Sequence, residues 1–184
     1  MASTENNYVT HGLRGQVGEL FVFKLVNGKT IVAAPPHKSQ NEPTEKQQKQ
    51  RELFQEAAIY GKTVMVTPEL KALYETSVPE GGSVYKVALA DFMNAPKIKE
   101  VDVSKYVGDI GNTIRIRAID DFMVKNVEVA ITNEDGTLVE EGDAVKQGNG
   151  VDWLFTATVK NDTPTGDKIV VRAYDLPGNV AVWD

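Results

Sequence analysis

The chain lacks cysteine and contains little histidine. With no cysteine among 184 residues, it has no disulfide framework, no thiolate metal site and no cysteine nucleophile. The two histidines, His11 and His37, fall in polar loops with no other metal-ligating side chain at a ligand spacing, so we expect both on the surface. The motifs Gly-x-Ser-x-Gly, His-Glu-x-x-His and the P-loop are also missing. These absences argue against the hydrolase and metalloenzyme classes that such residues mark, and we expect no enzymatic activity.

Long hydrophobic runs are missing as well. No apolar stretch approaches the length of a membrane span, and the first ten residues have no basic segment followed by an apolar one. We therefore expect no membrane insertion and no signal peptide. The location is then cytoplasmic by default, although a signal peptide removed beforehand would leave the same sequence.

An excess of positive charge, which nucleic-acid binding requires, is also missing. The net charge is −6, and it is unevenly distributed. Residues 1–98 contain eleven basic and ten acidic side chains, whereas residues 99–184 contain nine basic and sixteen acidic ones. Because affinity for nucleic acids comes mostly from lysine and arginine contacts to phosphates, we expect no nucleic-acid partner for the acidic half.

The N-terminal half begins with a hairpin signal. Asn27 and Gly28 lie between two apolar runs, residues 19–26 and 29–34. Both turn residues tolerate the positive φ that a type I′ turn demands, so the pair predicts a two-residue β-hairpin.

Both faces of this hairpin are apolar. The predicted register pairs Phe23 with Val32 and places Phe21 on the same face, while Val22 and Ile31 fall on the other face. A two-stranded ribbon of this kind is marginal in isolation and must be covered. Either the helices and the C-terminal domain cover it, or a partner protein or second copy joins the hairpin edge by strand addition.

Helix signals follow the hairpin. Thr44 and Gln47 fit a capping box that opens a helix of residues 44–62. Thr67 followed by Pro68 is typical of an N-cap with proline at the first helical position, and a third helix is predicted over residues 83–93. We therefore predict an α+β domain over residues 1–97, made of a β-hairpin and about three helices.

The C-terminal half has the alternating pattern of an all-β domain. Apolar and polar residues alternate in short runs separated by turn signals. We expect about seven strands, near residues 98–103, 113–119, 124–133, 137–140, 153–160, 169–173 and, as a last edge, 180–183, with a further short one near residue 144. The prediction is a second domain over residues 98–184, folded as a β-sandwich.

Four runs in this half carry a recognisable pattern, namely residues 113–121, residues 127–131, the motif Trp153-Leu154-Phe155-Thr156, and Arg172-Ala173-Tyr174-Asp175 with Gly178-Asn179. Together they resemble bacterial immunoglobulin-like modules. The resemblance implies an immunoglobulin-like sandwich used as a spacer or adhesion module, and the missing cysteine pair separates it from antibody domains. In the N-terminal half, the run Gly15-Gln16-Val17-Gly18 with the capping box and the following helices resembles an uncharacterised bacterial family, from which no function follows.

A binding surface is expected in the loops of the second domain. In an immunoglobulin topology the loops after the second, fourth and sixth strands meet at one end, where the first strand enters. These loops are residues 120–122, 146–152 and 175–179, so we expect them to face the N-terminal domain. The residues predicted to form an interaction surface are Phe122 and Asn149 in these loops and Phe21 and Phe23 in the hairpin.

The same loops contain oxygen-bearing side chains. Asp120, Asp121, Asp175 and Asn179 together offer ligands for a hard cation such as Ca²⁺, which takes six to eight oxygens. In the alternative interpretation each aspartate accepts hydrogen bonds from the backbone of its own turn. Apart from this Ca²⁺ site we expect no cofactor.

The sequence favours a non-catalytic structural or protein-interaction protein. One alternative is a carbohydrate-binding accessory protein, in which Trp153, Trp183 and Tyr174 would stack on sugars; the alternation around Trp153 favours its burial instead. Another alternative is an assembly subunit of a phage-like or secretion machine. The sequence does not separate these functions.

Overall fold

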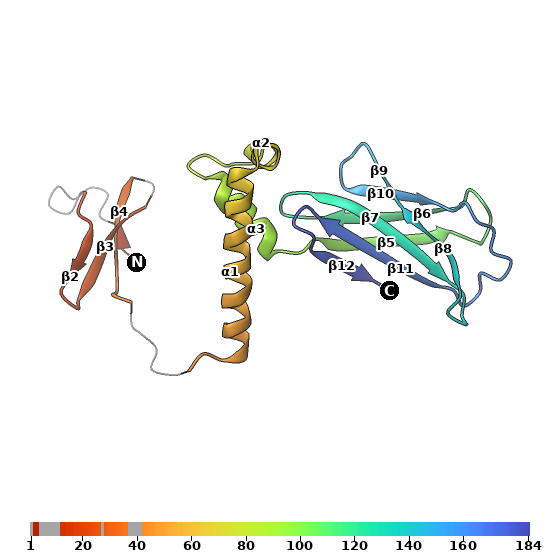
Figure 1. The fold of residues 1–184 in the computed structure, drawn as a ribbon, viewed down its shortest axis with the longest axis horizontal. Coiled ribbons are helices and arrows are strands. Elements are labelled where there is room, and N and C mark those ends of the chain that lie inside the picture. Colours follow the sequence, from red (N-terminus) through yellow and green to blue (C-terminus); the bar gives the residue numbers. More distant parts are fainter. Residues whose placement is uncertain (1, 4–11, 27, 37–41) are drawn as a thin grey trace. The chain divides into compact units, whose positions relative to one another are not determined.

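The structure is a computed structural model that describes residues 2–3, 12–26, 28–36 and 42–184. Its contacts divide the chain into two compact units, residues 1–49 and residues 50–184 (Figure 1). The first unit contains a small sheet and the beginning of a helix. The second contains the rest of that helix, further helices and a pair of sheets.

The first unit is built around the predicted hairpin. Strands β3 (Phe21–Val26) and β4 (Lys29–Ala33) are antiparallel, and Phe23 pairs with Val32 as predicted. Asn27 lies outside the described residues. The sequence did not predict β1 (Ala2–Ser3) or β2 (Gly15–Val17), which pair with the two edges of the hairpin in the order β1-β4-β3-β2.

This first sheet has a strongly apolar face. Phe21 and Phe23 lie on it with their rings in an edge-to-face contact, 5.7 Å between centroids. Because side chains alternate along a strand, Val22 and Lys24 lie on the opposite face. Of residues 12–26, 28–36 and 42–49, only Thr30 is buried. The described part of this unit therefore contains no buried apolar core.

The helices begin where the sequence predicts. In α1 (Glu45–Val66) the capping box forms in both directions. The backbone nitrogen of Gln47 donates to Thr44 Oγ1 at 3.3 Å, and the backbone nitrogen of Thr44 donates to Gln47 Oε1 at 3.1 Å. The next helix, α2 (Pro68–Glu75), starts with proline, and α3 (Val84–Met93) follows a short connection. Within the described ranges, none of the helices combines the length and hydrophobicity that a membrane crossing requires.

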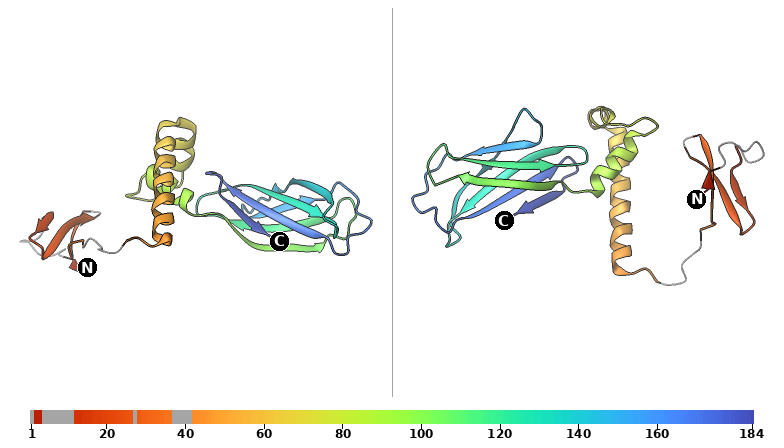
Figure 2. Two further views of the ribbon diagram at one scale, coloured as in Figure 1. Left: turned by 60° about the horizontal axis from the view of Figure 1, so that its bottom comes forward. Right: turned by 180° about the vertical axis from the view of Figure 1, so that it is seen from behind.

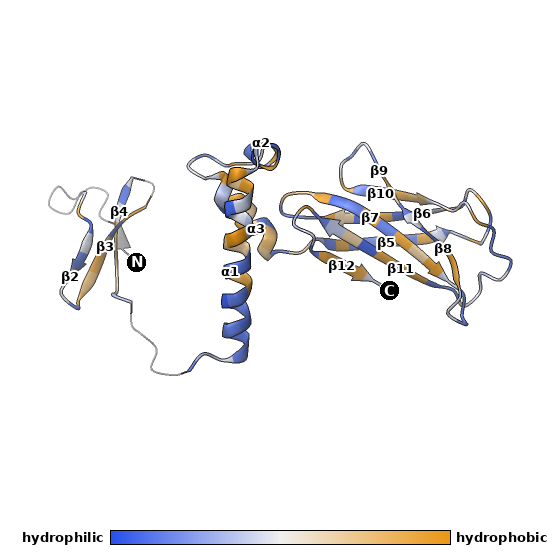
Figure 3. Ribbon diagram, in the orientation of Figure 1, coloured by the Kyte–Doolittle hydropathy of each residue, from blue (hydrophilic) through white to orange (hydrophobic). Residues whose placement is uncertain are grey.

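The helices of the second unit share a small core. The first turns of α1 are hydrophilic, and its apolar side chains concentrate in the later turns (Figure 3). There Val64 packs with Tyr74 of α2 and with Val84 and Ala88 of α3. Leu176, which follows the strand β11 described below, packs against the same core.

Strands follow the helices, and we call residues 97–184 the two-sheet body. Its strands are β5 (Lys97–Lys105), β6 (Thr113–Ile119), β7 (Val124–Thr132), β8 (Leu138–Asp143), β9 (Val145–Lys146), β10 (Asp152–Thr156), β11 (Lys168–Asp175) and β12 (Val180–Trp183). They form two antiparallel sheets with the orders β5-β6-β10-β9 and β12-β11-β7-β8. Figure 2 shows these layers from two further directions.

One hydrophobic core lies between the two layers. Ile114 and Ile116 of β6 meet Val127 and Val129 of β7, and Val171 of β11 joins them. The burial of β6 alternates at every residue, as its sequence pattern predicts. The prediction of helices in the N-terminal half and antiparallel strands in the C-terminal half is confirmed.

The predicted domain boundary between residues 97 and 98 stays a prediction; what the contacts give is a division into units. This division falls inside α1, between Lys49 and Gln50. The physical reason is that the helices after this point share apolar contacts and hydrogen bonds with the loops of the two-sheet body, for example between Asn179 and Phe92.

Candidate functional site: an aspartate cluster beside helix α3

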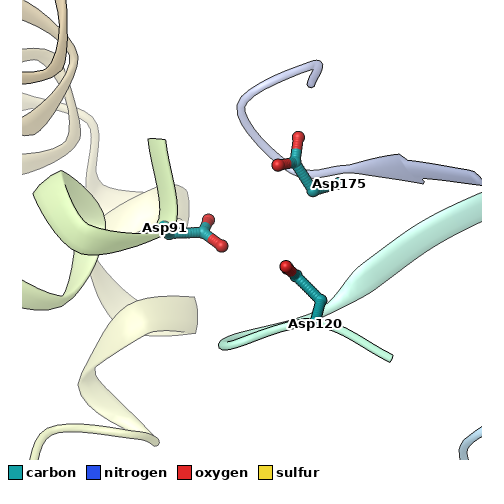
Figure 4. Close-up of side chains that lie close together, drawn as sticks. All are labelled: Asp91, Asp120 and Asp175. Carbon is teal, nitrogen blue, oxygen red and sulfur yellow. The ribbon is translucent and has the colours of Figure 1, made fainter. Parts of the chain in front are cut away.

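Two loops of the two-sheet body meet the C-terminal half of α3 (Figure 4). One loop joins β6 to β7 and the other joins β11 to β12. Both lie at the same end of the two-sheet body, because the end of β11 pairs with the start of β7. The Asn179 side-chain amide donates to the Phe92 carbonyl at 3.1 Å, and the Asn94 side-chain amide donates to Asp121 at 2.9 Å. These bonds hold the helix against the loops.

Three aspartates come together at this junction. Asp91 comes from α3, Asp120 from the loop after β6, and Asp175 from the end of β11. One carboxylate oxygen of each lies within 4.8 Å of the others, and the carboxylates of Asp91 and Asp120 point toward one another (Figure 4). Asp91 and Asp175 are each only 1% exposed. Among the ion pairs of the described residues, none involves these three carboxylates.

Hydrogen bonds fix each aspartate in place. Asp91 Oδ2 accepts from the Tyr74 hydroxyl, and Asp120 Oδ2 accepts from the Met123 amide at 3.1 Å. Asp175 Oδ1 accepts from the amides of Gly178 at 2.8 Å and Asn179 at 2.6 Å, and its Oδ2 accepts from Asn179 Nδ2 at 2.7 Å. The other oxygens, Oδ1 of Asp91 and Oδ1 of Asp120, are buried without a hydrogen-bond partner.

The environment disfavours negative charge on two of these groups. Burial raises the pKa of Asp91 to about 7; the hydrogen bond from Tyr74 acts in the opposite direction, and the nearby Asp120 and Asp175 carboxylates raise it further. Burial also raises the pKa of Asp175, against the lowering effect of its bonds from Asn179 and Gly178. The junction therefore holds carboxylates that are costly to ionise together.

An aromatic cluster supports the junction from the helical side. The Tyr74 hydroxyl lies 2.9 Å from the Tyr60 hydroxyl, which extends the bonded chain from Asp91. The Tyr74 ring stacks on Phe122 at 4.3 Å between centroids, and the Tyr60 ring packs against Phe92 at 5.4 Å. Phe122 thus brings the loop after β6 into contact with the helical core.

The structure brings together two of the four predicted cation ligands, Asp120 and Asp175. Asp121 is exposed and binds Asn94 outside the cluster. Asn179 directs its amino group, not its oxygen, toward Asp175 and the Phe92 carbonyl. Because both of these groups are acceptors, the side-chain atom that faces them is the donor Nδ2. Asn179 therefore positions Asp175 and does not offer a ligand oxygen to a cation. The turn bonds of Asp120 and Asp175 agree with the alternative interpretation of these residues.

Sequence reasoning missed Asp91, the most informative member of the cluster. The signal is its spacing: Val84, Ala88 and Asp91 lie at i, i+4 and i+7 and are all buried. An acidic residue on the apolar stripe of a helix is unusual and needs a partner. The inward alternation of Val171 and Ala173 likewise continues to Asp175.

The predicted interaction residues have different environments. Phe21 and Phe23 lie on the apolar face of the first sheet. Phe122 is half-buried in the aromatic cluster, and the Asn149 side chain is bonded within its own turn, donating to Asp152 at 2.7 Å. The predicted surface positions His11 and His37 lie outside the described residues.

The aromatics expected of a sugar-binding surface do not share a face. Trp153 is 4% exposed and lies in the core. Tyr174 pairs with Val180 and Trp183 pairs with Val171, so the rings of Tyr174 and Trp183 project from opposite faces of their sheet. A common stacking platform of these three residues is therefore not formed.

The resemblance to bacterial immunoglobulin-like modules rests on the short runs quoted above, and whole-chain comparisons add no family to it. They confirm neither that family nor a bacterial origin. No protein-family model, no curated protein and no solved structure matches this chain.

Proposed function

We propose that this protein is a non-catalytic structural protein that assembles with other copies of itself through its first sheet. The observation that carries the proposal is the apolar face of that sheet. The register places five apolar side chains on this face, those of Val17, Phe21, Phe23, Leu25 and Val32.

This face lacks the burial that a stable sheet needs. Leu25 is 51% exposed, Val17 is 48% exposed and Phe21 is 36% exposed. Burying apolar surface contributes about 25 cal/mol per Å², so covering this face would stabilise the sheet considerably. Short isolated sheets are marginal in water unless another layer packs on them.

A second copy supplies a suitable cover. Two sheets pack face to face at about 10 Å when each has an apolar inner face, and an identical sheet offers an equal area of the same chemistry. A two-fold arrangement brings the same patch of both copies together and closes the assembly. Phe21 and Phe23, predicted from the sequence as interaction residues, would then lie inside the contact.

Light scattering of the full chain over a range of micromolar concentrations tests the proposal. We expect a mass that rises with concentration for the wild type and a monomer for Leu25→Asp, which places a charge on the apolar face. Val26→Asp is the matched control, because Val26 is similarly exposed at 46% but lies on the opposite face.

The control should associate as the wild type does. A wild-type protein that remains monomeric would contradict the proposal, as would equal loss of association in both variants. Under electron microscopy, rings or tubes in place of closed dimers would favour the assembly-subunit alternative, because they require a contact that does not close on two copies.

We further propose that the two-sheet body is an immunoglobulin-like sandwich that acts as a scaffold. Its support is the strand order: β5-β6-β10-β9 corresponds to A-B-E-D, and β12-β11-β7-β8 corresponds to G-F-C with an added C′ strand. The pairing of β9 with β10 is the critical element, since a switch of β9 to the other sheet would give another topology. Nuclear Overhauser contacts between the backbones of Leu154 and Val145 would support the assignment, and their absence would contradict it.

A further inference from the structure

We propose that Asp91, Asp120 and Asp175 bind a Ca²⁺ ion, which joins α3 to the two-sheet body. The proposal does not depend on assembly through the first sheet, so the two can fail separately. It differs from the site predicted from sequence, because Asp91 replaces Asp121 and Asn179 as a ligand.

Hydrogen bonds hold the three carboxylates in fixed orientations before any ion binds. Hydrogen bonds from Tyr74 and Met123 occupy one oxygen each of Asp91 and Asp120, and Oδ1 of each has no hydrogen-bond partner. Asp175 is held by amides on both of its oxygens. Ligand carboxylates that are oriented by bonds to their other oxygen are typical of metal sites.

The burial of Asp91 points to a ligand independently of the clustering. Its side chain is 1% exposed, and its Oδ1 has no hydrogen-bond partner. A buried carboxylate oxygen without a partner is costly, because the group has lost its water and gained no donor in exchange. The Asp91 carboxylate points toward Asp120 (Figure 4), and one oxygen of each of the three aspartates lies within 4.8 Å of the others, so a cation at the cluster would compensate the buried charge.

The three side chains also have the chemistry that a hard cation requires. Carboxylate oxygens are the ligands that Ca²⁺ prefers, and three aspartates, each coordinating through one oxygen, supply three of the six to eight oxygens it takes. A cavity of about 270 Å³ adjoins Asp91 and is also lined by Lys86, Asp121 and Phe122. Of the three aspartates, the cavity touches Asp91 alone, so the water ligands that would complete the coordination shell would enter from the Asp91 side.

A proton shared between two of the carboxylates is the alternative to a cation as a way of reducing the negative charge of the cluster. Asp91 and Asp120 lie close enough for a carboxyl–carboxylate hydrogen bond when one of them is protonated. In that case the cluster would remain intact with no cation, and added Ca²⁺ would have no effect at neutral pH. Titration with Ca²⁺ therefore separates the two possibilities.

The experiment uses the full chain after treatment with a chelator, at neutral pH. We expect calorimetric titration with Ca²⁺ to show one site per chain, and the melting temperature to rise by several degrees when Ca²⁺ is about 100-fold above its dissociation constant. Asp91→Asn and Asp120→Asn should each weaken binding by at least about tenfold while preserving the size of the side chain.

Asp121→Asn is the matched control, because Asp121 is the exposed neighbour of Asp120 and binds Asn94 outside the cluster. It should bind Ca²⁺ as the wild type does. Absence of both heat and a melting shift in the wild type would overturn the proposal. Equal weakening by Asp120→Asn and Asp121→Asn would also overturn it, because binding would then follow general surface charge.

A spectroscopic measurement keeps the proposal testable if the Asp91 and Asp120 variants fail to fold. Tb³⁺ occupies Ca²⁺ sites and emits when a nearby tyrosine transfers its excitation. Since the Tyr74 hydroxyl bonds Asp91, we expect tyrosine-sensitised Tb³⁺ emission from the wild type that Ca²⁺ reverses by competition. No sensitised emission, or emission that Ca²⁺ does not displace, would contradict the site.

Discussion

The side-chain amide of Asn179 donates to the carbonyl oxygens of Phe92 at 3.1 Å and Asp91 at 3.5 Å, and thereby caps the C-terminal end of α3 from another part of the chain. The last four carbonyls of a helix have no partner within it. Asn94 satisfies another of them locally, since its amide donates to the Ala90 carbonyl at 3.1 Å. The end of α3 is therefore held both by its own neighbour and by the loop after β11.

Asn179→Ala should destabilise the protein by about 1–3 kcal/mol, because it leaves helix carbonyls and one oxygen of Asp175 without a donor in a part-buried place. Asn94→Ala also removes a side-chain amide that donates two hydrogen bonds, but from an exposed position where water can replace it. It should lower the free energy of unfolding by at most about 0.5 kcal/mol. Urea unfolding of both variants measures the difference. Equal losses would show that the contact with the two-sheet body adds nothing to the local cap.

The hydroxyl chain from Tyr60 through Tyr74 to Asp91 predicts an unequal response to removing either hydroxyl. Tyr74→Phe leaves Asp91 Oδ2 and the Tyr60 hydroxyl without their partner and should cost about 1–3 kcal/mol. Tyr60→Phe leaves the bond between Tyr74 and Asp91 intact and should cost about 0.5–1.5 kcal/mol. Chemical unfolding of the two variants provides the measurement, and the prediction fails if Tyr60→Phe is the more damaging change.

The features that the sequence predicted well are those set by neighbouring residues. The capping box at Thr44, the proline at the start of α2 and the alternation along β6 each depend on contacts within a few residues. The predicted strands at residues 113–119 and 180–183 coincide with β6 and β12. Local propensity and periodicity are sufficient to predict these elements, because the tertiary contacts favour the same structure that the local sequence favours.

The candidate site was harder to predict because distant segments create it. Asp120 and Asp175 were predicted to lie in loops at one end of the domain, which requires only a topology. Their meeting with Asp91 depends on how α3 packs against that end, and no local pattern encodes this packing. The edge strand β2, likewise, is a short glycine-containing segment that becomes a strand only by pairing with β3.

Stability at acidic pH should depend on Asp152, on the outer face of the two-sheet body. Hydrogen bonds from Arg117 Nε at 2.7 Å and Nη2 at 3.1 Å, and then from Asn149, lower the pKa of Asp152 to about 2. Because this pKa is below the value near 4 of an unfolded chain, the contribution is present above about pH 4 and is lost as the pH falls toward 2.

Melting temperatures recorded between pH 5 and 2, in steps of about half a unit, test this dependence. Asp152→Asn removes the titrating carboxylate and should reduce the fall in melting temperature over that window. Arg117→Ala removes the main partner and should reduce it as well. If both variants show the wild-type slope, other acidic groups determine the acid sensitivity.

Gly108 and Gly111 offer a matched pair for separating backbone strain from steric conflict at the end of the body remote from α3. Both have a left-handed backbone, with φ of +91° and +86°, so alanine at either should cost about 1–2 kcal/mol. A Cβ at Gly111 would meet nothing within 4 Å, whereas a Cβ at Gly108 would collide with the Asn161 carbonyl oxygen.

The collision cannot be relieved without cost, because the backbone nitrogen of Asn161 donates to the Gly108 carbonyl at 2.8 Å and this bond holds the two backbones together. Gly108→Ala should therefore be less stable than Gly111→Ala by a further 1–3 kcal/mol or so in urea unfolding. If the two variants were equally stable, the backbones at Gly108 and Asn161 would have to separate freely. In that case the bond between them would contribute nothing to holding this end of the sheets closed.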